Sequence, residues 1–273
     1  MTTREKPRAL TQKETATIAE FAHSEFLRVL MLEDSISVDD IVFHGETSLR
    51  LIHKSSRYSE DLDFMIQERI IPELNSLLPK VVQDVATGMR ADIPNLEIQW
   101  KSKMKPDTNM MVGMMSLKNP LWHKDVKVKV ECYPAHDMSH YMTSKLDIGD
   151  SNTVVPTATL ESIMGDKLVA LAKRPYFKER DAYDVWWLTK KGIEPSIEYI
   201  ENSCMVYGYD PQEIVELLGS IHDRIGDPTV LENDLKKWLP DDLHTHFKRH
   251  NIFEQIQEAT INACMTCHHA MGM

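Results

Sequence analysis

The chain has 273 residues, of which 42% are apolar and 27% charged, and its formal net charge at pH 7 is −11. These proportions are typical of a soluble globular protein and exclude an intrinsically disordered chain. The acidic balance argues against broad, non-specific binding of nucleic acid, because counterion release from phosphates requires Lys and Arg. RNA as a specific substrate remains compatible with it, since a local basic groove can lie on an acidic body.

The sequence shows no pattern of a targeting or membrane segment. Basic residues occur within the first ten positions, but no apolar run follows them, so we expect no signal peptide. No apolar run approaches the length that is needed to cross a bilayer. We therefore expect a cytoplasmic protein without a membrane partner.

The first half of the chain alternates between helical and extended patterns. Thr11 and Glu14 have the spacing of a capping box, which predicts a helix from about 12 to 32. A short apolar strand at 41–43 leads through a turn at Gly45 into a second, shorter helix. The remaining periodicity of this half predicts a strand at 62–66, a helix at 70–86, and strands at 96–104, 110–117 and 126–133.

The second half of the chain is helical throughout. Its apolar spacing predicts helices at about 160–173, 179–190, 196–205, 211–222, 228–238 and 241–265. The join between the two patterns lies near 150–158, so we predict two domains, 1–155 and 156–273. The expected fold class is α+β: a mixed β-sheet core flanked by helices, followed by a C-terminal helical domain.

A cysteine-containing segment lies near the end of the last predicted helix. Cys264, Cys267 and His268 fit the pattern of c-type haem attachment, and they could also contribute to a zinc site. Haem attachment needs an export signal and zinc needs further ligands. We therefore predict that this segment is a plain helical tail.

Asp61 directly precedes the strand predicted at 62–66 and Asp63 lies within it, so the two carboxylates stand at alternate positions. Alternate residues of a strand point to the same side, so these carboxylates lie a few ångströms apart and repel each other. A divalent cation relieves that repulsion, and Mg²⁺ or Mn²⁺ bound by one or two carboxylates together with substrate phosphates suits such a pair. An Asp-x-Asp sequence also occurs on ordinary solvated strands, so the pair alone does not decide the function.

Other residues in chain order strengthen the metal hypothesis. Glu131 lies on the polar face of a later strand and could complete a two-metal site. Gly45 turns the chain into a helix whose first residues include Thr47 and Ser48. Backbone amides and hydroxyls at such a helix start favour phosphate, so these three residues are candidate nucleotide ligands.

The segments at 43–51 (FHGETSLRL) and 57–64 (RYSEDLDF) resemble the AbiEii/AbiGii toxin family of nucleotidyltransferases. Members of that family typically read Gly-Gly-Thr-Ala-Leu and then Arg-Phe/Tyr-Ser-Glu-Asp-Leu-Asp-Phe. The second block matches almost letter for letter, whereas Glu46 replaces the second glycine of the first. The segments at 160–174 (LESIMGDKLVALAKR) and 178–184 (KERDAYD) are similar to a later motif of the same family.

The resemblance implies a nucleotidyltransferase fold and a metal-dependent transfer of a nucleotide from an NTP. It implies that Lys167 holds the triphosphate, and that Asp181 orients Lys167 or acts on the acceptor. Arg57 would contact phosphate or remain an exposed loop charge, and Ser59 would position the nucleotide or satisfy a turn. The acceptor would be RNA, for example a tRNA 3′ end, or a protein. The chain would be the toxin of a toxin–antitoxin or abortive-infection pair with a separate antitoxin.

Two other functions remain open at this point. A degenerate member of the family would bind nucleotide without turnover, and Glu46 favours that alternative because it would repel a triphosphate. A phosphohydrolase or nuclease could use the same carboxylates, since two-metal chemistry serves both reactions.

Overall fold

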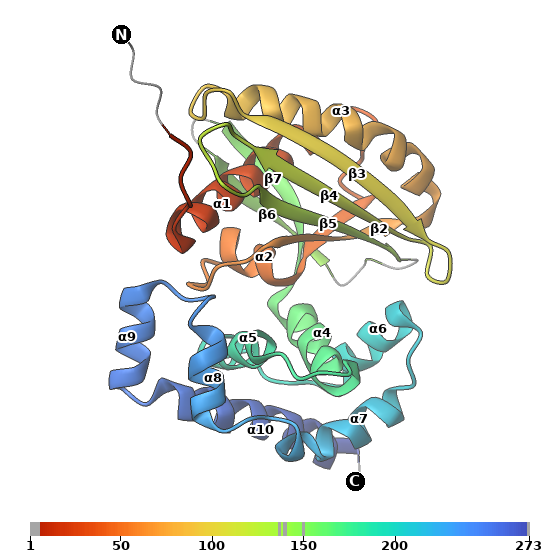
Figure 1. Cartoon of the computed structure of the whole chain (residues 1–273). Helices are drawn as coiled ribbons and strands as arrows, with labels where there is room; N and C mark the ends of the chain where they lie inside the picture. Colours follow the sequence, from red (N-terminus) through yellow and green to blue (C-terminus); the bar gives the residue numbers. More distant parts are fainter. Residues whose placement is uncertain (1–5, 136–137, 139–140, 149–150, 272–273) are drawn as a thin grey trace. The chain divides into compact units, whose positions relative to one another are not determined.

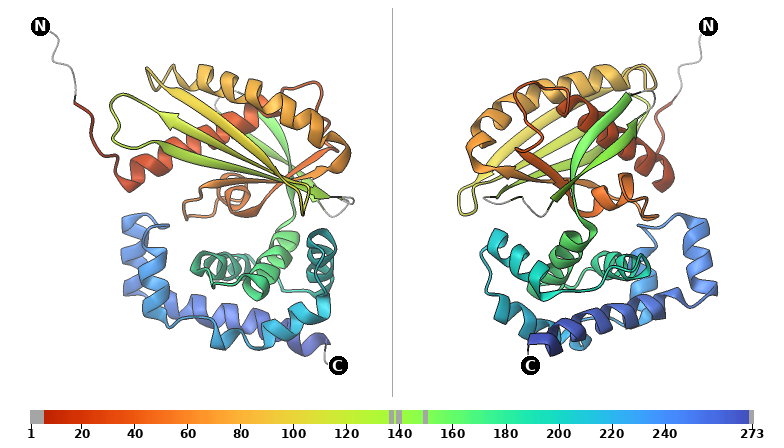
Figure 2. Two further views of the ribbon diagram at one scale, coloured as in Figure 1. Left: turned by 45° about the vertical axis from the view of Figure 1, so that its right-hand side comes forward. Right: turned by 180° about the vertical axis from the view of Figure 1, so that it is seen from behind.

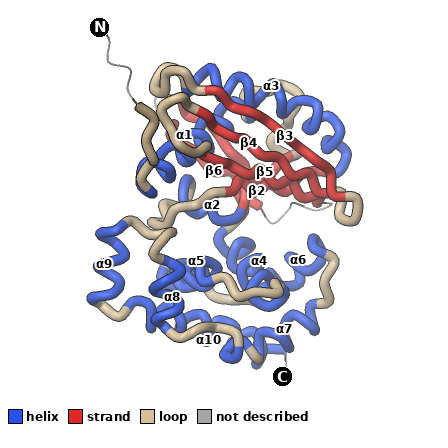
Figure 3. The backbone as a smooth tube through the Cα atoms, in the orientation of Figure 1, coloured by secondary structure: helices blue, strands red, loops and turns tan. Residues whose placement is uncertain are grey.

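The protein, seen in a computed structural model, folds into two compact units (Figure 1). The structure describes residues 6–135, 138, 141–148 and 151–271. Unit 1 takes the chain as far as Lys54 and then Tyr58–Thr157, whereas unit 2 takes Ser55–Arg57 and the chain from Ala158 onward. Figure 3 shows that the strands belong to unit 1 and that unit 2 is built from helices and loops.

Unit 1 is built around a mixed seven-stranded sheet with the order β3-β4-β5-β2-β1-β7-β6. Strand β2 runs parallel to β5 and antiparallel to β1, which in turn runs parallel to β7. This mixed sheet with its flanking helices confirms the predicted α+β class. The strands are β1 (Ile41–His44), β2 (Asp61–Gln67), β3 (Glu97–Lys105), β4 (Met110–Lys118), β5 (Val126–Ala135), β6 (Tyr141–Ile148) and β7 (Ser151–Ala158).

The sequence did not predict β6 and β7. Neither strand has clear alternation of apolar and polar residues, and β7 contains Pro156, which lacks a backbone N–H. In the register of β7 with β1, Phe43 pairs with Thr157. Such a strand depends on its place beside β1 rather than on its own pattern.

Helices α1 (Gln12–Leu30) and α3 (Ile71–Met89) pack together against the sheet (Figure 2). The capping box of α1 is present, since Thr11 accepts a hydrogen bond from the backbone of Glu14 and Glu14 accepts one in return. Between helix and sheet, the ring of Phe64 contacts those of Phe26 and Phe43 at centroid distances of 6.1 and 5.4 Å. This buried layer fixes β2, so the outward-facing residues of the strand have a rigid support.

Unit 2 contains seven α-helices within the described part of the chain. The predicted single helix at 241–265 is wrong. The chain breaks between α9 and α10 at Asn251, whose φ of +52° lies in the left-handed region. The helices are α4 (Leu160–Lys173), α5 (Glu179–Lys190), α6 (Ile197–Tyr207), α7 (Pro211–Gly219), α8 (Pro228–Leu235), α9 (Asp241–Arg249) and α10 (Ile252–Met271).

Arg224 stabilises the C-terminal end of α4. Its guanidinium donates hydrogen bonds to the carbonyls of Leu171, Ala172 and Arg174, the last of which follows the helix. These carbonyls lack partners within the helix, and a cation there also interacts favourably with the helix dipole. Arg224 therefore holds the end of the helix that carries Lys167.

The cysteine-containing segment lies in α10. Cys264 and Cys267 are buried, and Nδ1 of His268 lies 3.1 Å from the carbonyl oxygen of Val215 on α7. These side chains pack the helical unit, as the helical-tail reading predicts. No helix among the described residues is both long and apolar enough to cross a membrane.

Candidate active site

Four charged side chains occupy adjacent positions on one face of β2 and β5. The parallel register pairs Asp61 with Lys129 and Asp63 with Glu131. Since paired residues and alternate residues of neighbouring strands point to the same side, the four side chains form one patch. We call these four residues the acidic patch. Sequence periodicity predicted the shared face of Asp61 and Asp63, and the register now adds the two residues of β5.

The two aspartates of the acidic patch are costly to ionise. Burial raises the pKa of Asp63 to about 7, with further increases from the charges of Asp61, Glu46 and Glu131 and an opposing effect of His44. Burial also raises the pKa of Asp61, although Lys129 opposes the increase. A cation at this patch would therefore relieve a strong electrostatic penalty.

Lys129 provides part of that relief from within the chain. Its Nζ lies 3.3 Å from Oδ2 of Asp61 and 2.9 Å from Oε2 of Glu131. Burial would lower the pKa of Lys129, but its ion pairs with Glu131 and Asp61 outweigh this effect and raise it. The position of Lys129 on the same strand face as Glu131 was the signal in the sequence for this contact.

Helix α2 (Gly45–Leu51) begins directly beside Asp63. Gly45 has a φ of +75°, and a Cβ atom built on it would lie 2.5 Å from Oδ2 of Asp63. Only glycine accommodates both the backbone conformation and the nearby carboxylate. The backbone conformation and the contact with Asp63 therefore account for a glycine at position 45 without any role in phosphate binding.

The predicted hydroxyl ligands lie next to the same strand. The hydroxyl of Thr47 is 2.9 Å from that of Ser59 and also donates to the backbone carbonyl of Asp61. Thr47 and Ser59 thereby join α2 to the start of β2. Oγ of Ser48 is fully buried and has no hydrogen-bond partner within the described part of the chain.

Glu46, which the sequence marked as a residue that would repel a triphosphate, and His44, which sequence reasoning did not single out, also belong to this environment. Glu46 is buried, and its charge raises the pKa values of both Asp61 and Asp63. His44 is opposite Asp63 in the antiparallel register of β1 and β2. The charge of Glu46 thus acts on both aspartates of the acidic patch.

Unit 2 carries a second cluster of charges, on α4, α5 and nearby loops. Nζ of Lys167 lies 3.0 Å from Oδ1 of Asp181 and 2.7 Å from Oδ2 of Asp184. Arg57 and Arg174 pair with the same two aspartates. We call these five residues the basic cluster, because three cations and two carboxylates leave one positive charge in excess.

Arg57 is buried, which decides against one of its two sequence-based expectations. It is 1% exposed, so the exposed loop charge is wrong. Its Nε and Nη2 donate to the two carboxylate oxygens of Asp184, each at 2.6 Å. Phosphate would have to compete with this bidentate ion pair. The structure thus gives Arg57 a partner within unit 2.

The donor chemistry of the acidic patch fits a single hard cation. Among the described residues, no group of three or more His, Cys, Asp or Glu side chains is arranged to hold a metal ion. Mg²⁺ does not require three, because it commonly binds one or two carboxylates and completes its shell with water and substrate phosphates. Asp61 and Asp63 would supply the two carboxylates.

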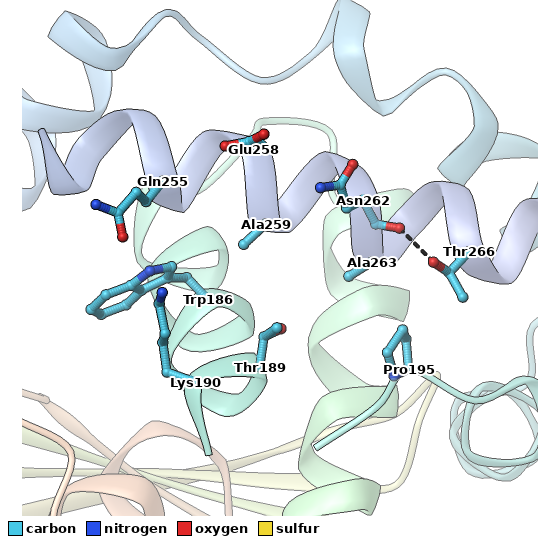
Figure 4. A pocket seen from close by; sticks show the side chains of 10 residues that line it. All are labelled: Trp186, Thr189, Lys190, Pro195, Gln255, Glu258, Ala259, Asn262, Ala263 and Thr266. Atoms are coloured by element: carbon cyan, nitrogen blue, oxygen red, sulfur yellow. Dashed lines mark hydrogen bonds between the residues drawn. The ribbon is translucent and has the colours of Figure 1, made fainter. Parts of the chain in front are cut away.

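A pocket of about 430 Å³ lies elsewhere in unit 2, between α5 and α10 (Figure 4). Trp186 and Lys190 line one side and Gln255 and Asn262 the other. None of the predicted catalytic or nucleotide-binding residues contributes to its lining. The lining contains no residue of either charged cluster.

Comparisons with known proteins identify similar folds. The 19%-identical protein JHP933 from Helicobacter pylori superposes with a TM-score of 0.52 over 95% of this chain and 94% of its own. MenT4, a nucleotidyltransferase toxin from Mycobacterium tuberculosis, is 14% identical, with a TM-score of 0.50 over 93% of this chain and 90% of its own. At these identities the similarity establishes the fold. A comparison with curated proteins gives no match.

The family model described as "Nucleotidyl transferase AbiEii toxin, Type IV TA system" matches residues 26–258. That range includes both charged clusters and confirms the resemblance seen in the sequence. The chain belongs to the AbiEii toxin family and is a nucleotidyltransferase.

Proposed function

We propose that this chain transfers a nucleotidyl group from an NTP to an RNA hydroxyl, with one Mg²⁺ or Mn²⁺ held by Asp61 and Asp63. The observation that carries the proposal is the same-face pair of carboxylates, both with raised pKa values, beside the start of α2. Membership of the AbiEii family supports the NTP as donor. A bound divalent cation would polarise the phosphoryl oxygens and neutralise the charge that develops on them.

The basic cluster suits the triphosphate. Lys167 is held by Asp181 and Asp184, each of which also has an arginine partner. A lysine with fixed orientation stabilises developing negative charge without reorganising during the reaction. We propose that Lys167 contacts the phosphates of the NTP and that Asp181 holds it in place.

Asp181 acts in this proposal as a positioning residue. One carboxylate oxygen accepts from Lys167 and the other from Arg174. This arrangement favours orientation of Lys167 over removal of a proton from the acceptor. In the proposed step the acceptor's hydroxyl oxygen forms a bond to the α-phosphorus as the bond to pyrophosphate breaks, and the hydroxyl proton passes to solvent water.

Label transfer tests the activity directly. The protein is incubated with Mg²⁺, total RNA and each NTP labelled at its α-phosphate, and the products are separated on denaturing gels. We expect labelled RNA from the wild type, none from Asp61→Asn, and wild-type labelling from Asp92→Asn, which changes an exposed carboxylate of unit 1. Labelled protein without labelled RNA would indicate a protein acceptor. Identical, label-free results for wild type and Asp61→Asn would refute the transfer.

We also propose that a separate antitoxin neutralises the chain and that tRNA is the RNA acceptor. The family description supports the toxin–antitoxin pairing in general terms. Expression of the wild type and of Asp61→Asn in a bacterial host, from a tightly regulated promoter, tests toxicity. Equal growth of the two strains would contradict a toxic transferase.

A nucleotide-binding module without turnover is the second candidate, and Glu46 is the observation that favours it. Its charge lies close enough to raise the pKa values of both metal-site aspartates. Calorimetry with each NTP and Mn²⁺ separates the alternatives: binding without any labelled product would establish the module.

A further inference from the structure

Lys129 is the only side chain of the acidic patch that carries a positive charge. In the register of β2 and β5, Lys129 is paired with Asp61 and lies two residues before Glu131 on the same strand. Its Nζ contacts both carboxylates, at 3.3 and 2.9 Å. An ammonium group that bridges two carboxylates at these distances occupies the place of a bound cation.

The geometry has a consequence for Glu131. In a two-metal site, a third carboxylate must reach the second ion as well as share the environment of the first. Here Oε2 of Glu131 is 2.9 Å from the ammonium of Lys129, and the Glu131 side chain is only 14% exposed. Its charge is therefore already compensated from within the chain.

Building on the proposed function, we infer that Lys129 replaces the second metal ion, so that the site holds one divalent cation between Asp61 and Asp63. A lysine ammonium is a compact point charge that cannot coordinate a metal and repels one nearby. Asp61 therefore remains able to bind the cation, whereas the ion pair with Lys129 keeps Glu131 from binding a metal ion. The single cation matches the absence, among described residues, of a grouped three-carboxylate site.

Manganese binding to the full chain without nucleotide tests this inference. Mn²⁺ is titrated and the free ion is followed by electron paramagnetic resonance, with binding heats measured in parallel. We expect one Mn²⁺ per wild-type chain. In Lys129→Gln, removal of the ammonium frees Glu131, so we expect a second Mn²⁺ to bind and the first to bind at least tenfold more tightly.

Two variants control for charge and for location. Lys129→Arg keeps a cation at the same position and should bind one Mn²⁺. Lys127→Gln removes a lysine from the same face of β5, two residues earlier, where the side chain is exposed, and should behave like the wild type. Far-ultraviolet circular dichroism of each variant checks that the sheet is intact.

Each outcome is decisive for Lys129. Two Mn²⁺ ions in the wild type, unchanged binding in Lys129→Gln, or equal effects of Lys127→Gln and Lys129→Gln would overturn the inference. Failure of the proposed function is distinguishable, because a chain that binds one Mn²⁺ but labels no acceptor retains the role of Lys129 and loses the transfer. Binding that Asp61→Asn leaves unchanged would place the ion elsewhere and overturn both.

Discussion

Arg57 and Asp184, 127 positions apart in the sequence, form a bidentate ion pair with both N···O distances at 2.6 Å. The two side chains are 2% and 1% exposed. Arg57 belongs to unit 2, although the chain returns to unit 1 at Tyr58. The connection between α2 and β2 is therefore anchored in the helical unit only four residues before Asp61.

Removal of one partner from this pair should destabilise the protein strongly. Asp184→Asn removes the carboxylate that accepts two hydrogen bonds from the buried guanidinium of Arg57, and breaking a buried ion pair costs about 3–5 kcal/mol. Urea unfolding followed by circular dichroism measures the change. Replacement of both partners, Arg57→Met with Asp184→Leu, should cost less than Asp184→Asn alone, because the guanidinium is removed with its carboxylate and Lys167 keeps Asp181 as its partner. The account would be contradicted if the double variant lost as much unfolding free energy as Arg57→Met and Asp184→Leu, measured singly, lose in sum.

Gly45→Ala should impair metal binding more than stability. The substituted Cβ would lie 2.5 Å from Oδ2 of Asp63, so the carboxylate must move. Gly192→Ala is a matched control, because Gly192 has a similar φ of +81° with nothing within 4 Å of the added Cβ. Both variants should lose about 1 kcal/mol of unfolding free energy from backbone strain. Only Gly45→Ala should weaken Mn²⁺ binding, and equal binding by both variants would count against the contact.

The sequence predicted those features that depend only on residues close together in the chain. The capping box at Thr11 and the shared face of Asp61 and Asp63 depend on spacing alone. The partner of Arg57 depends on a helix more than a hundred residues away, and the contacts of Lys129 depend on the register between β2 and β5. No local pattern contains these pairings, so sequence periodicity could place Lys129 on a face but not against Asp61.

Lys167→Gln should abolish transfer while largely preserving the fold. Loss of a preorganised charge that stabilises the transition state costs about 100- to 1,000-fold in rate. Asp181 and Asp184 keep their arginine partners, so the loss of unfolding free energy should stay below that of Asp184→Asn. Label transfer and urea unfolding are measured on both variants. Lys173→Gln, on the same helix but partly exposed beside Glu213, should retain activity. Normal transfer by Lys167→Gln would remove it from the catalytic machinery.

His23 should make the protein sensitive to mild acid. Burial lowers its pKa from 6.5 to about 4, against an opposing contact of Nε2 with the Glu60 carbonyl. Since the unfolded chain binds this proton more readily, the stability is fully present above pH 6.5 and is lost as the pH falls towards 4. The loss is about 3 kcal/mol.

The matched variant is His23→Gln, whose amide can donate to the same carbonyl without titrating. Urea unfolding at pH 7, 6, 5 and 4 should show a steeper loss of unfolding free energy for the wild type than for His23→Gln. Parallel profiles would mean that acid sensitivity arises at other groups.

Asp63 should set the pH at which the metal site becomes competent. Its pKa is raised to about 7, so its proton must leave before the carboxylate binds a cation. Without metal, this shift opposes folding: the stability of the native state falls as the pH rises from the ordinary value of 3.8 towards 7. Affinity for Mn²⁺ should therefore rise about tenfold per pH unit below pH 7 and level off above it.

Glu46→Gln provides the test of the electrostatic cause. The charge of Glu46 contributes to the raised pKa of Asp63, so its removal should move the midpoint of Mn²⁺ binding to lower pH. The pKa of Asp63 in this variant should still lie above its ordinary value, because burial is the largest cause of the increase. Calorimetric Mn²⁺ titrations from pH 5 to 8 measure both midpoints. A wild-type midpoint near pH 4 would show that the pKa of Asp63 is not raised. A midpoint that Glu46→Gln leaves unchanged would show that the charge of Glu46 does not affect Asp63, and the presence of Glu46 in place of the family's second glycine would then need a steric explanation.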